Sequence, residues 1–382
     1  MQSCVEMRIL YISNNSSTGG APAALLNLVR QLKDRHEIAV MMPDSKGPLF
    51  HQMAVLGVKT YTSCNYVLSI WPRVLNPIKY LSRIFGLFRN RNEVRVYVGS
   101  VLDEFKPDVV HTNVGPLDIA SEECRKRGIP HIWHLREYQD KDFGMTYFPG
   151  GKTGFRSLLL QKNNHCLAIT EGVYAHWGLS GDSNVIYDGV ISPVPYEKVS
   201  KAGYFLYAAR IEKGKGLHVL LKAFRKYRSS GGRLRLLVAG RPCGIYAYLC
   251  RMYVRLYGMT DAVDFLGNRN DVFELMRRAD ALVVPSRFEG FGFTTAEAMY
   301  TKCPDIGNDK AGTKEQFDNG LKQTGTEIGL RFHDVEELAE HLAAVENGGF
   351  GKMVDSAYDV VTTLYTVERY AAQVEAYYNT VR

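Results

Sequence analysis

Two carboxylates in the segment Pro285–Met299 have the type and spacing that would suit binding of a phosphorylated sugar. Glu289 lies on a glycine-rich turn after an apolar run, and Glu297 follows in a helical pattern. A carboxylate on the turn can accept hydrogen bonds from sugar hydroxyls, and Glu297 can bind a ribose. From spacing alone, an acid at a helix start followed by a solvated helical glutamate is an equally good interpretation.

The residues around this pair favour a ligand. Gly290 and Gly292 allow the backbone to approach a bound molecule closely. Backbone N–H groups at the expected helix start, near Thr294 and Thr295, suit a phosphate. This stretch therefore predicts an anion site beside a sugar site.

The elements that must position these residues alternate along the chain. Short β-branched runs predict strands at residues 8–13, 37–42, 108–111, 131–134, 166–170 and 184–187, then at 204–208, 234–239, 263–266 and 281–284. Helical patterns are expected at 21–32, 216–227, 336–346 and 353–381. Such alternation predicts parallel βαβ units in an α/β fold, with ligands bound at the carboxyl ends of the strands.

Two strand series predict two domains. The segment Asp188–Lys201 contains Gly189, Pro193 and Pro195 and is the expected hinge. We therefore expect an N-terminal Rossmann-like domain at 1–195, a C-terminal Rossmann-like domain at 196–360 and a final helix at 361–382.

Composition excludes several classes. The chain has 382 residues, 46% hydrophobic and 23% charged, with a net charge of +7. These values exclude intrinsic disorder, and no repeat suggests collagen or a coiled coil. No apolar run is long enough for a transmembrane helix, and the N-terminus lacks signal-peptide features. The seven cysteines contain no C-x-x-C spacing, which favours a reducing cytoplasm over disulfides or structural zinc.

The carboxylate segment also resembles a known family. Glu289 and Glu297 in a P-S-x-x-E-G-F-G setting resemble the E-x7-E signature of family 4 retaining glycosyltransferases. Further similar segments are Gly19-Gly20-Ala21, Pro107–His111, Val185–Val190, Ala208–Gly216 and Ala311–Glu315. The resemblance covers nearly the whole chain and implies the GT-B fold, with two Rossmann-like domains facing a central cleft. It also implies that the domain at 1–195 binds the acceptor, that the domain at 196–360 binds the nucleotide sugar, and that the helix at 361–382 returns to the first domain.

The resemblance implies a role for each site residue, with a nucleoside diphosphate sugar as donor. Arg210 and Lys215 would neutralise the leaving diphosphate, Glu289 would bind the sugar and Glu297 the ribose. His134 occupies the place of a histidine that bonds the donor sugar near the reacting carbon, and His111 is a weaker candidate. The remaining residues implied in donor binding are Gly290, Phe291, Gly292, Phe293, Thr294, Thr295, Gly267 and Gly240. Gly19 and Gly20 would form a loop near the acceptor and the phosphate.

Neither a cofactor nor a metal is expected. Asp140 and Asp142 form a D-x-D triplet of the type that holds Mg²⁺ or Mn²⁺ in other transferases. A solvated loop is the favoured interpretation, since Arg210 and Lys215 already supply cations. We therefore predict a transferase whose diphosphate is neutralised by side chains.

The segment 71–95 is unusually basic, with six basic residues against one acid. Its apolar residues recur at helical spacing: Leu75, Ile78, Leu81, Ile84, Phe85 and Phe88. Such a helix can lie on an anionic membrane, which would suit a lipid-linked acceptor, or it can pack on its own domain with its basic face in solvent. No motif for nucleic-acid binding is found.

The expected function is transfer of a sugar to a glycan or lipid-linked acceptor, in cell-surface polysaccharide biosynthesis. The expected location is the cytoplasm, at the inner face of the plasma membrane. Lys302 and Asp305 depart from the family pattern, which has glycine and valine there. Two alternatives stay open: an inactive GT-B scaffold at the membrane, and a nucleotide-sugar epimerase on the same fold.

Overall fold

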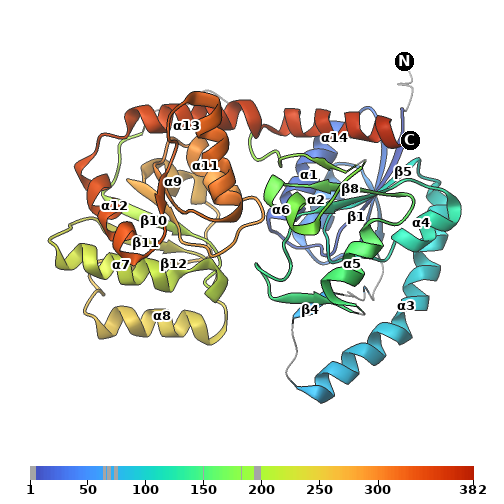
Figure 1. Ribbon diagram of the computed structural model, residues 1–382, viewed down its shortest axis with the longest axis horizontal. Coiled ribbons are helices and arrows are strands. Elements are labelled where there is room, and N and C mark those ends of the chain that lie inside the picture. The colour runs from blue at the N-terminus through green and yellow to red at the C-terminus, as the bar shows by residue number, and fades with distance from the viewer. Residues whose placement is uncertain are drawn as a thin grey trace. The chain divides into compact units, whose positions relative to one another are not determined.

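The computed structural model describes residues 6–62, 66, 70–72, 76–148, 150–181, 183–192 and 199–382. The chain divides into two compact units. Unit 1 comprises Met1–Gly189 together with Val367–Arg382, and unit 2 comprises Val190–Thr366. Each unit contains its own parallel sheet with helices on both faces (Figure 1).

Unit 1 is built on a seven-stranded sheet with the order β3-β2-β1-β5-β6-β8-β9, parallel throughout. Its strands are β1 (Arg8–Ile12), β2 (Glu37–Met42), β3 (Lys59–Thr62), β5 (Val109–Thr112), β6 (His131–Leu135), β8 (Asn164–Ala168) and β9 (Asn184–Val185). A separate antiparallel pair joins β4 (Ile70–Pro72) to β7 (Met145–Tyr147). Every residue of β5 and β6 is buried, including the polar residues His111, Thr112, His131 and His134.

Helices cover both faces of this sheet. They are α1 (Gly20–Leu32), α2 (Pro48–Val55), α3 (Pro77–Phe105), α4 (Ser121–Arg127), α5 (Gly151–Leu159), α6 (Glu171–Trp177) and α14 (Val367–Val381). Residues of β1 alternate between two cores. Ile9 and Tyr11 pack with α1, α2 and α14, whereas Leu10 and Ile12 pack with α3 and α4.

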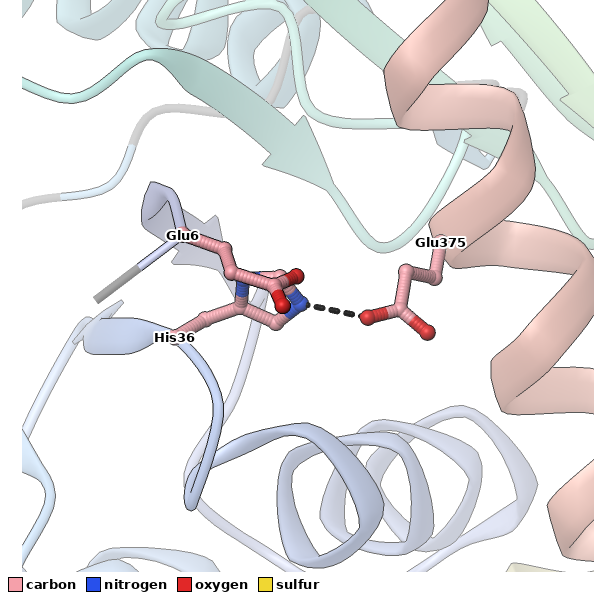
Figure 2. Close-up of side chains that lie close together, drawn as sticks. All are labelled: Glu6, His36 and Glu375. Carbon is pink, nitrogen blue, oxygen red and sulfur yellow. Dashed lines mark hydrogen bonds and ion pairs between the residues drawn. The ribbon is translucent and has the colours of Figure 1, made fainter. Parts of the chain in front are cut away.

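Helix α14 completes the first of these cores although it follows unit 2 in the sequence. Tyr370, Val374 and Tyr378 are buried in the cluster that also holds residues of α1. Glu375 accepts a hydrogen bond from Arg35 at 2.7 Å and lies 2.7 Å from Nε2 of His36. Figure 2 shows His36 and Glu375 with Glu6 beside them. These contacts attach α14 to the residues just before β2, and both are made by the Glu375 carboxylate.

Unit 2 contains a six-stranded parallel sheet with the order β12-β11-β10-β13-β14-β15. Its strands are β10 (Tyr204–Ala208), β11 (Arg235–Ala239), β12 (Val263–Gly267), β13 (Ala281–Val284), β14 (Asp305–Asn308) and β15 (Leu330–Phe332). Its helices are η1 (Lys213–Lys215), α7 (Leu217–Ser229), α8 (Gly244–Leu256), α9 (Val272–Arg278), α10 (Phe293–Tyr300), α11 (Ala311–Thr324), α12 (Val335–Asn347) and α13 (Gly351–Leu364).

The predicted α/β fold with two parallel sheets is confirmed, and most expected strands lie within two residues of their predicted bounds. The helix expected at 353–381 is wrong in one respect. It is two helices, α13 and α14, separated at Tyr365 and Thr366. Of the expected hinge, residues 193–198 lie outside the described residues.

Helix α3 has two halves with different surroundings. In the second half, Val94, Val98, Val101, Leu102 and Phe105 pack into the core of unit 1. In the first half, Ile78, Leu81, Phe85 and Phe88 are 60% to 77% exposed. The interpretation of packing on its own domain therefore holds for the second half and for Leu87, which is buried, but not for these four side chains. Leu75 lies outside the described residues, and no helix of the described chain is long and apolar enough to cross a membrane.

Candidate functional site

The carboxyl edge of the unit 2 sheet brings together residues from four strands. Arg210 follows β10, Gly240 follows β11, Gly267 ends β12 and Glu289 follows β13. Because the paired strands are parallel, their carboxyl ends lie at one edge, where α/β sheets bind ligands. The sheet thus gathers the predicted donor residues of unit 2, although they span almost eighty positions of sequence.

Lys215 and Glu289 contact each other directly. The ammonium of Lys215 donates to both carboxylate oxygens of Glu289, at 2.7 and 2.8 Å. The two side chains are 23% and 16% exposed, so the pair is shielded but reachable from solvent. Arg210 is nearly half exposed, and its guanidinium lies 3.0 Å from the Glu212 carboxylate. The edge therefore carries two cations and two carboxylates within reach of a ligand.

Close backbone contacts hold these loops together. A Cβ at Gly240 would lie 1.8 Å from the carbonyl oxygen of Ala209, so only glycine fits between β10 and β11 at this level. A Cβ at Gly216 would lie 1.9 Å from the carbonyl oxygen of Pro285. Glycine therefore allows the loop that carries Lys215 to approach the loop that carries Glu289.

Hydrogen bonds from α11 hold the turn before α10. The Gln316 amide donates to the carbonyl oxygens of Phe291 and Gly292, at 2.7 and 3.0 Å. Gly292 has a positive φ of 98° and caps α10, which begins at Phe293. Phe291 is buried against Tyr365, whereas Gly290, Phe293 and Thr294 are partly exposed.

Thr295, predicted as a phosphate contact, is not exposed at the helix start. Its side chain is fully buried, and its backbone N–H donates to the carbonyl oxygen of Gly292 at 3.1 Å. Neither group is therefore available to a phosphate in this structure. Glu297, one turn into α10, is partly buried, and desolvation raises the pKa of its carboxyl to about 7.

Both departures from the family pattern occupy demanding positions. Lys302 has a φ of 49°, the left-handed conformation for which glycine was expected, and its ammonium pairs with Asp355 at 2.6 Å. Asp305 is buried in β14, and among the described residues its carboxylate has no hydrogen-bond partner. The Thr295 hydroxyl is near enough to lower its pKa but does not reach hydrogen-bond geometry. Burial dominates and raises the pKa of Asp305 to about 7.

Asp305 should therefore make unit 2 less stable at alkaline pH. Its folded-state pKa is above the unfolded value, so its contribution is fully present below about pH 4 and lost as the pH rises through about 7. We expect Asp305→Val to raise the free energy of unfolding by about 1–3 kcal/mol at pH 8, with a smaller gain at pH 5. Urea unfolding at both pH values measures this.

Asp305→Asn is the matched control, because it removes the titration but keeps a buried polar group. Asp305→Asn should, like Asp305→Val, raise the free energy of unfolding more at pH 8 than at pH 5, because the wild-type carboxyl titrates and the amide does not. Its gain should be smaller than that of Asp305→Val at both pH values. An equal gain from Asp305→Val at pH 5 and pH 8 would show that the carboxyl does not titrate in this range.

In unit 1 the predicted loop is present. Gly19 caps α1, Gly20 is its first residue, and both are exposed. The carbonyl oxygen of Gly19 accepts from the N–H of Ala23 at 3.0 Å. The amide of Asn113 donates to the carbonyl oxygen of Ala21 at 2.9 Å, tying the helix start to the end of β5.

His134 is fully buried in a polar network of unit 1. Its Nδ1 lies 3.2 Å from Nε2 of His111 and 3.3 Å from the Arg136 guanidinium. His111 in turn lies 2.7 Å from the Tyr378 hydroxyl, through its Nδ1. Burial and the charge of Arg136 hold the pKa of both histidines well below the usual range, so they are neutral. The Nε2 of His134 has no partner among the described residues, and its role toward a sugar stays a prediction.

The buried ion pair of Arg136 and Asp188 was missed by the sequence analysis. Arg136 bonds both carboxylate oxygens of Asp188, and its Nε donates to the carbonyl oxygen of Asn113 at 2.8 Å. It also donates to the Tyr370 hydroxyl of α14 at 3.0 Å. One signal was available: Arg136 directly follows the buried strand β6, where an unpaired charge would be costly.

The D-x-D triplet is engaged within its own surroundings. Asp142 accepts from the N–H groups of Tyr138 and Phe143, at 2.8 and 2.9 Å, and burial raises its pKa to about 6. Asp140 lies 3.0 Å from Nε2 of His176. The triplet thus orders its own loop in unit 1.

Comparison with known proteins identifies both units. Residues 19–176 match the model of the glycosyl transferase 4-like domain, and residues 192–356 match that of glycosyl transferases group 1. The mannosyltransferase LpsB of lipopolysaccharide core biosynthesis in Rhizobium meliloti is 32% identical over 28% of this chain and 31% of its own length. The O-antigen chain mannosyltransferase RfbU of Salmonella typhimurium is 28% identical over 47% of this chain and 53% of its own. The matched segments thus span about a third to a half of these curated relatives.

Solved structures match over the full length. HepE of Anabaena, crystallised with UDP, superposes with a TM-score of 0.77 at 16% identity, covering 98% of this chain and 100% of that one. WaaG, a glycosyltransferase involved in lipopolysaccharide biosynthesis, superposes with a TM-score of 0.65 at 15% identity, covering 96% and 99%. The two family models together match most of the sequence, and the chain belongs to the group 1 glycosyl transferases, among the family 4 enzymes of the GT-B fold.

Proposed function

We propose that this chain is a retaining glycosyltransferase that moves a sugar from a nucleoside diphosphate sugar to a glycan or lipid-linked acceptor. The observation that carries the proposal is the placement of Lys215, Glu289 and Arg210 at one sheet edge. The relatives support a role in polysaccharide biosynthesis, since LpsB is a mannosyltransferase of lipopolysaccharide core biosynthesis and RfbU is an O-antigen chain mannosyltransferase. The donor class is supported by HepE, which was crystallised with UDP and UDP-glucose.

In this proposal the diphosphate binds Arg210 and Lys215, a planar fork and a point charge that suit phosphate oxygens. The Lys215 ammonium already holds Glu289, so phosphate oxygens must share or replace that bond. Glu289 then accepts bonds from sugar hydroxyls, and Glu297 binds the ribose. Because these two cations serve the diphosphate, we propose that the reaction needs no metal or cofactor.

The reaction exchanges one bond at the anomeric carbon for another on the same face of the sugar. The bond from that carbon to the phosphate oxygen breaks, and a bond to the acceptor hydroxyl oxygen forms. The acceptor proton passes to the departing phosphate oxygen, so the products are the glycoside and the nucleoside diphosphate. Catalysis then comes from positioning and from stabilising the charge on the leaving group.

The exposed half of α3 supports a lipid-linked acceptor and a location at the cytoplasmic membrane surface. Its exposed apolar side chains accompany Lys79, Arg83 and Arg89, for which no ion pair is found in the described part of the chain. In contrast, Arg91 and Arg95 pair with Asp118 and Glu122 of unit 1. Free cations beside apolar side chains are typical of helices that bind anionic membranes.

Thermal unfolding with UDP, GDP, ADP and CMP, each with and without EDTA, tests the donor site. A ligand at about 100 times its Kd adds about 2.7 kcal/mol to the free energy of unfolding. We expect a shift with one diphosphate that EDTA leaves unchanged and that Arg210→Ala or Lys215→Ala reduces. Lys213→Ala removes an exposed lysine of the same turn and should leave the shift intact.

Other outcomes distinguish the alternatives. Loss of the shift in EDTA would contradict a reaction without metal. Turnover of the donor with no acceptor present would favour an epimerase. If Glu289→Ala preserved the cellular function, the chain would act as a binding scaffold instead of an enzyme.

A further inference from the structure

Helix α8 of unit 2 carries an apolar stripe on the side that faces solvent. Its members are 41% to 77% exposed: Ile245, Tyr248, Leu249, Met252 and Leu256. Single exposed apolar side chains are ordinary on a soluble protein, but a continuous row of five on one helix is not. The stripe lies outside the donor site, and the function proposed above does not account for it.

The stripe is a second face of the helix, separate from the face that packs on unit 2. At about 100° per residue, its five members fall within an arc of roughly 100°. Ala247, Cys250 and Val254 lie on the opposite side and are buried in the unit 2 core. Figure 1 shows α8 beyond α7 in unit 2, and the exposure of the five side chains shows that no other described element covers them. The core of unit 2 therefore does not need these five side chains.

The charges on α8 itself have one sign. From Gly240 to Thr260 the chain has no Asp or Glu, and it contains Arg241, Arg251 and Arg255, all exposed. The guanidinium of Arg251 lies over the Phe265 ring at 4.5 Å, and none of the three arginines has an ion pair within the described residues. Arginine and tyrosine beside aliphatic side chains suit the boundary between headgroups and acyl chains.

We propose that α8 lies on an anionic lipid surface, with the stripe inserted among acyl chains and the arginines at the headgroup phosphates. A symmetric contact with a second copy would place these arginines against their equivalents, with no acid on this face to neutralise them. An anionic bilayer supplies both the apolar phase and the negative charge. Unit 2 would thus have a membrane contact of its own, whether or not α3 of unit 1 also binds.

The proposal is tested by flotation with vesicles of phosphatidylcholine alone or with phosphatidylglycerol. The test variant combines Ile245→Ser, Leu249→Ser and Leu256→Ser, both in the intact chain and in a chain that carries Ile78→Ser, Phe85→Ser and Phe88→Ser in α3. We expect the wild type to bind the anionic vesicles preferentially. The α8 substitutions should lower the partition coefficient for anionic vesicles about tenfold or more, both in the intact chain and in the chain with the α3 substitutions.

A matched control replaces three exposed apolar residues that belong to neither helix, Val55→Ser, Leu160→Ser and Leu321→Ser. It should bind vesicles as the wild type does, and unchanged circular dichroism and nucleotide thermal shifts would show that all variants are folded. A second variant, Arg251→Gln with Arg255→Gln, should weaken binding to anionic vesicles and reduce its dependence on salt.

Equal binding by the α8 variant and the wild type would overturn the proposal. It would also fail if the wild type bound neither kind of vesicle. Should the chain be dimeric and the α8 substitutions make it monomeric without affecting vesicle binding, the stripe would be a self-contact. None of these measurements depends on sugar transfer, so the function proposed above can fail or hold independently.

Discussion

Replacing Lys215 with alanine is expected to lower the turnover number of sugar transfer by about 10²–10³-fold, with a smaller effect on KM. In the proposed function the Lys215 ammonium lies where charge develops on the departing diphosphate, so its contribution is expected to be greatest in the transition state. Its removal also leaves the Glu289 carboxylate without its cation, 2.7 Å away in the wild type. Initial rates at varied donor concentration separate the two kinetic parameters.

Arg210→Ala should reduce turnover in the same way, whereas Lys213→Ala should stay close to the wild type because its side chain is exposed and unpaired with Glu289. Lys215→Arg keeps the charge but changes its geometry, and partial rescue is expected. If Lys215→Ala transferred sugar within about threefold of the wild-type rate, the proposed role at the leaving group would be rejected.

Asp188→Asn is expected to destabilise unit 1 by about 3–5 kcal/mol. Burial raises the pKa of the Asp188 carboxyl, whereas the adjacent Arg136 guanidinium favours its charged form and bonds both of its oxygens. The substitution leaves Arg136 without its counter-charge in a site that water cannot reach. Urea unfolding followed by tryptophan fluorescence reports unit 1 specifically, since Trp71, Trp133 and Trp177 all belong to it.

The control is Asp34→Asn, which breaks an exposed pair with Lys33 in the same unit. Surface pairs of this kind contribute about 0–1 kcal/mol, so the midpoint should hardly move. Similar midpoints for the two variants would show that water or a rearrangement compensates Arg136, and that the network around His134 does not depend on the pair.

Much of the framework was predictable because parallel strands covered on both faces are short apolar runs. Strands β10 and β13 have their expected bounds for this reason. The break at Tyr365 and Thr366 was not predictable, because neither glycine nor proline interrupts the helical pattern there. Helix α8 was missed because apolar residues on two opposite faces hide its period.

The candidate site was predictable by residue type but not by contact. Glu289 and Lys215 were singled out separately, and their direct bond depends on β10 lying beside β13 in the sheet. Thr295 shows the converse, since its expected place at the helix start did not reveal that its side chain turns inward to Asp305. Side-chain direction depends on packing between elements, which spacing along the chain does not contain.

The return of α14 to unit 1 has a consequence for how the protein is made. Unit 2 is one continuous insertion, whereas the core of unit 1 needs Tyr370 and Tyr378 from beyond it. On the ribosome, residues 190–366 are synthesised before α14 and leave the ribosome ahead of it. Until then Arg136 and His111 lack their phenol partners, so the part of the protein that is translated first is the last to reach its native state.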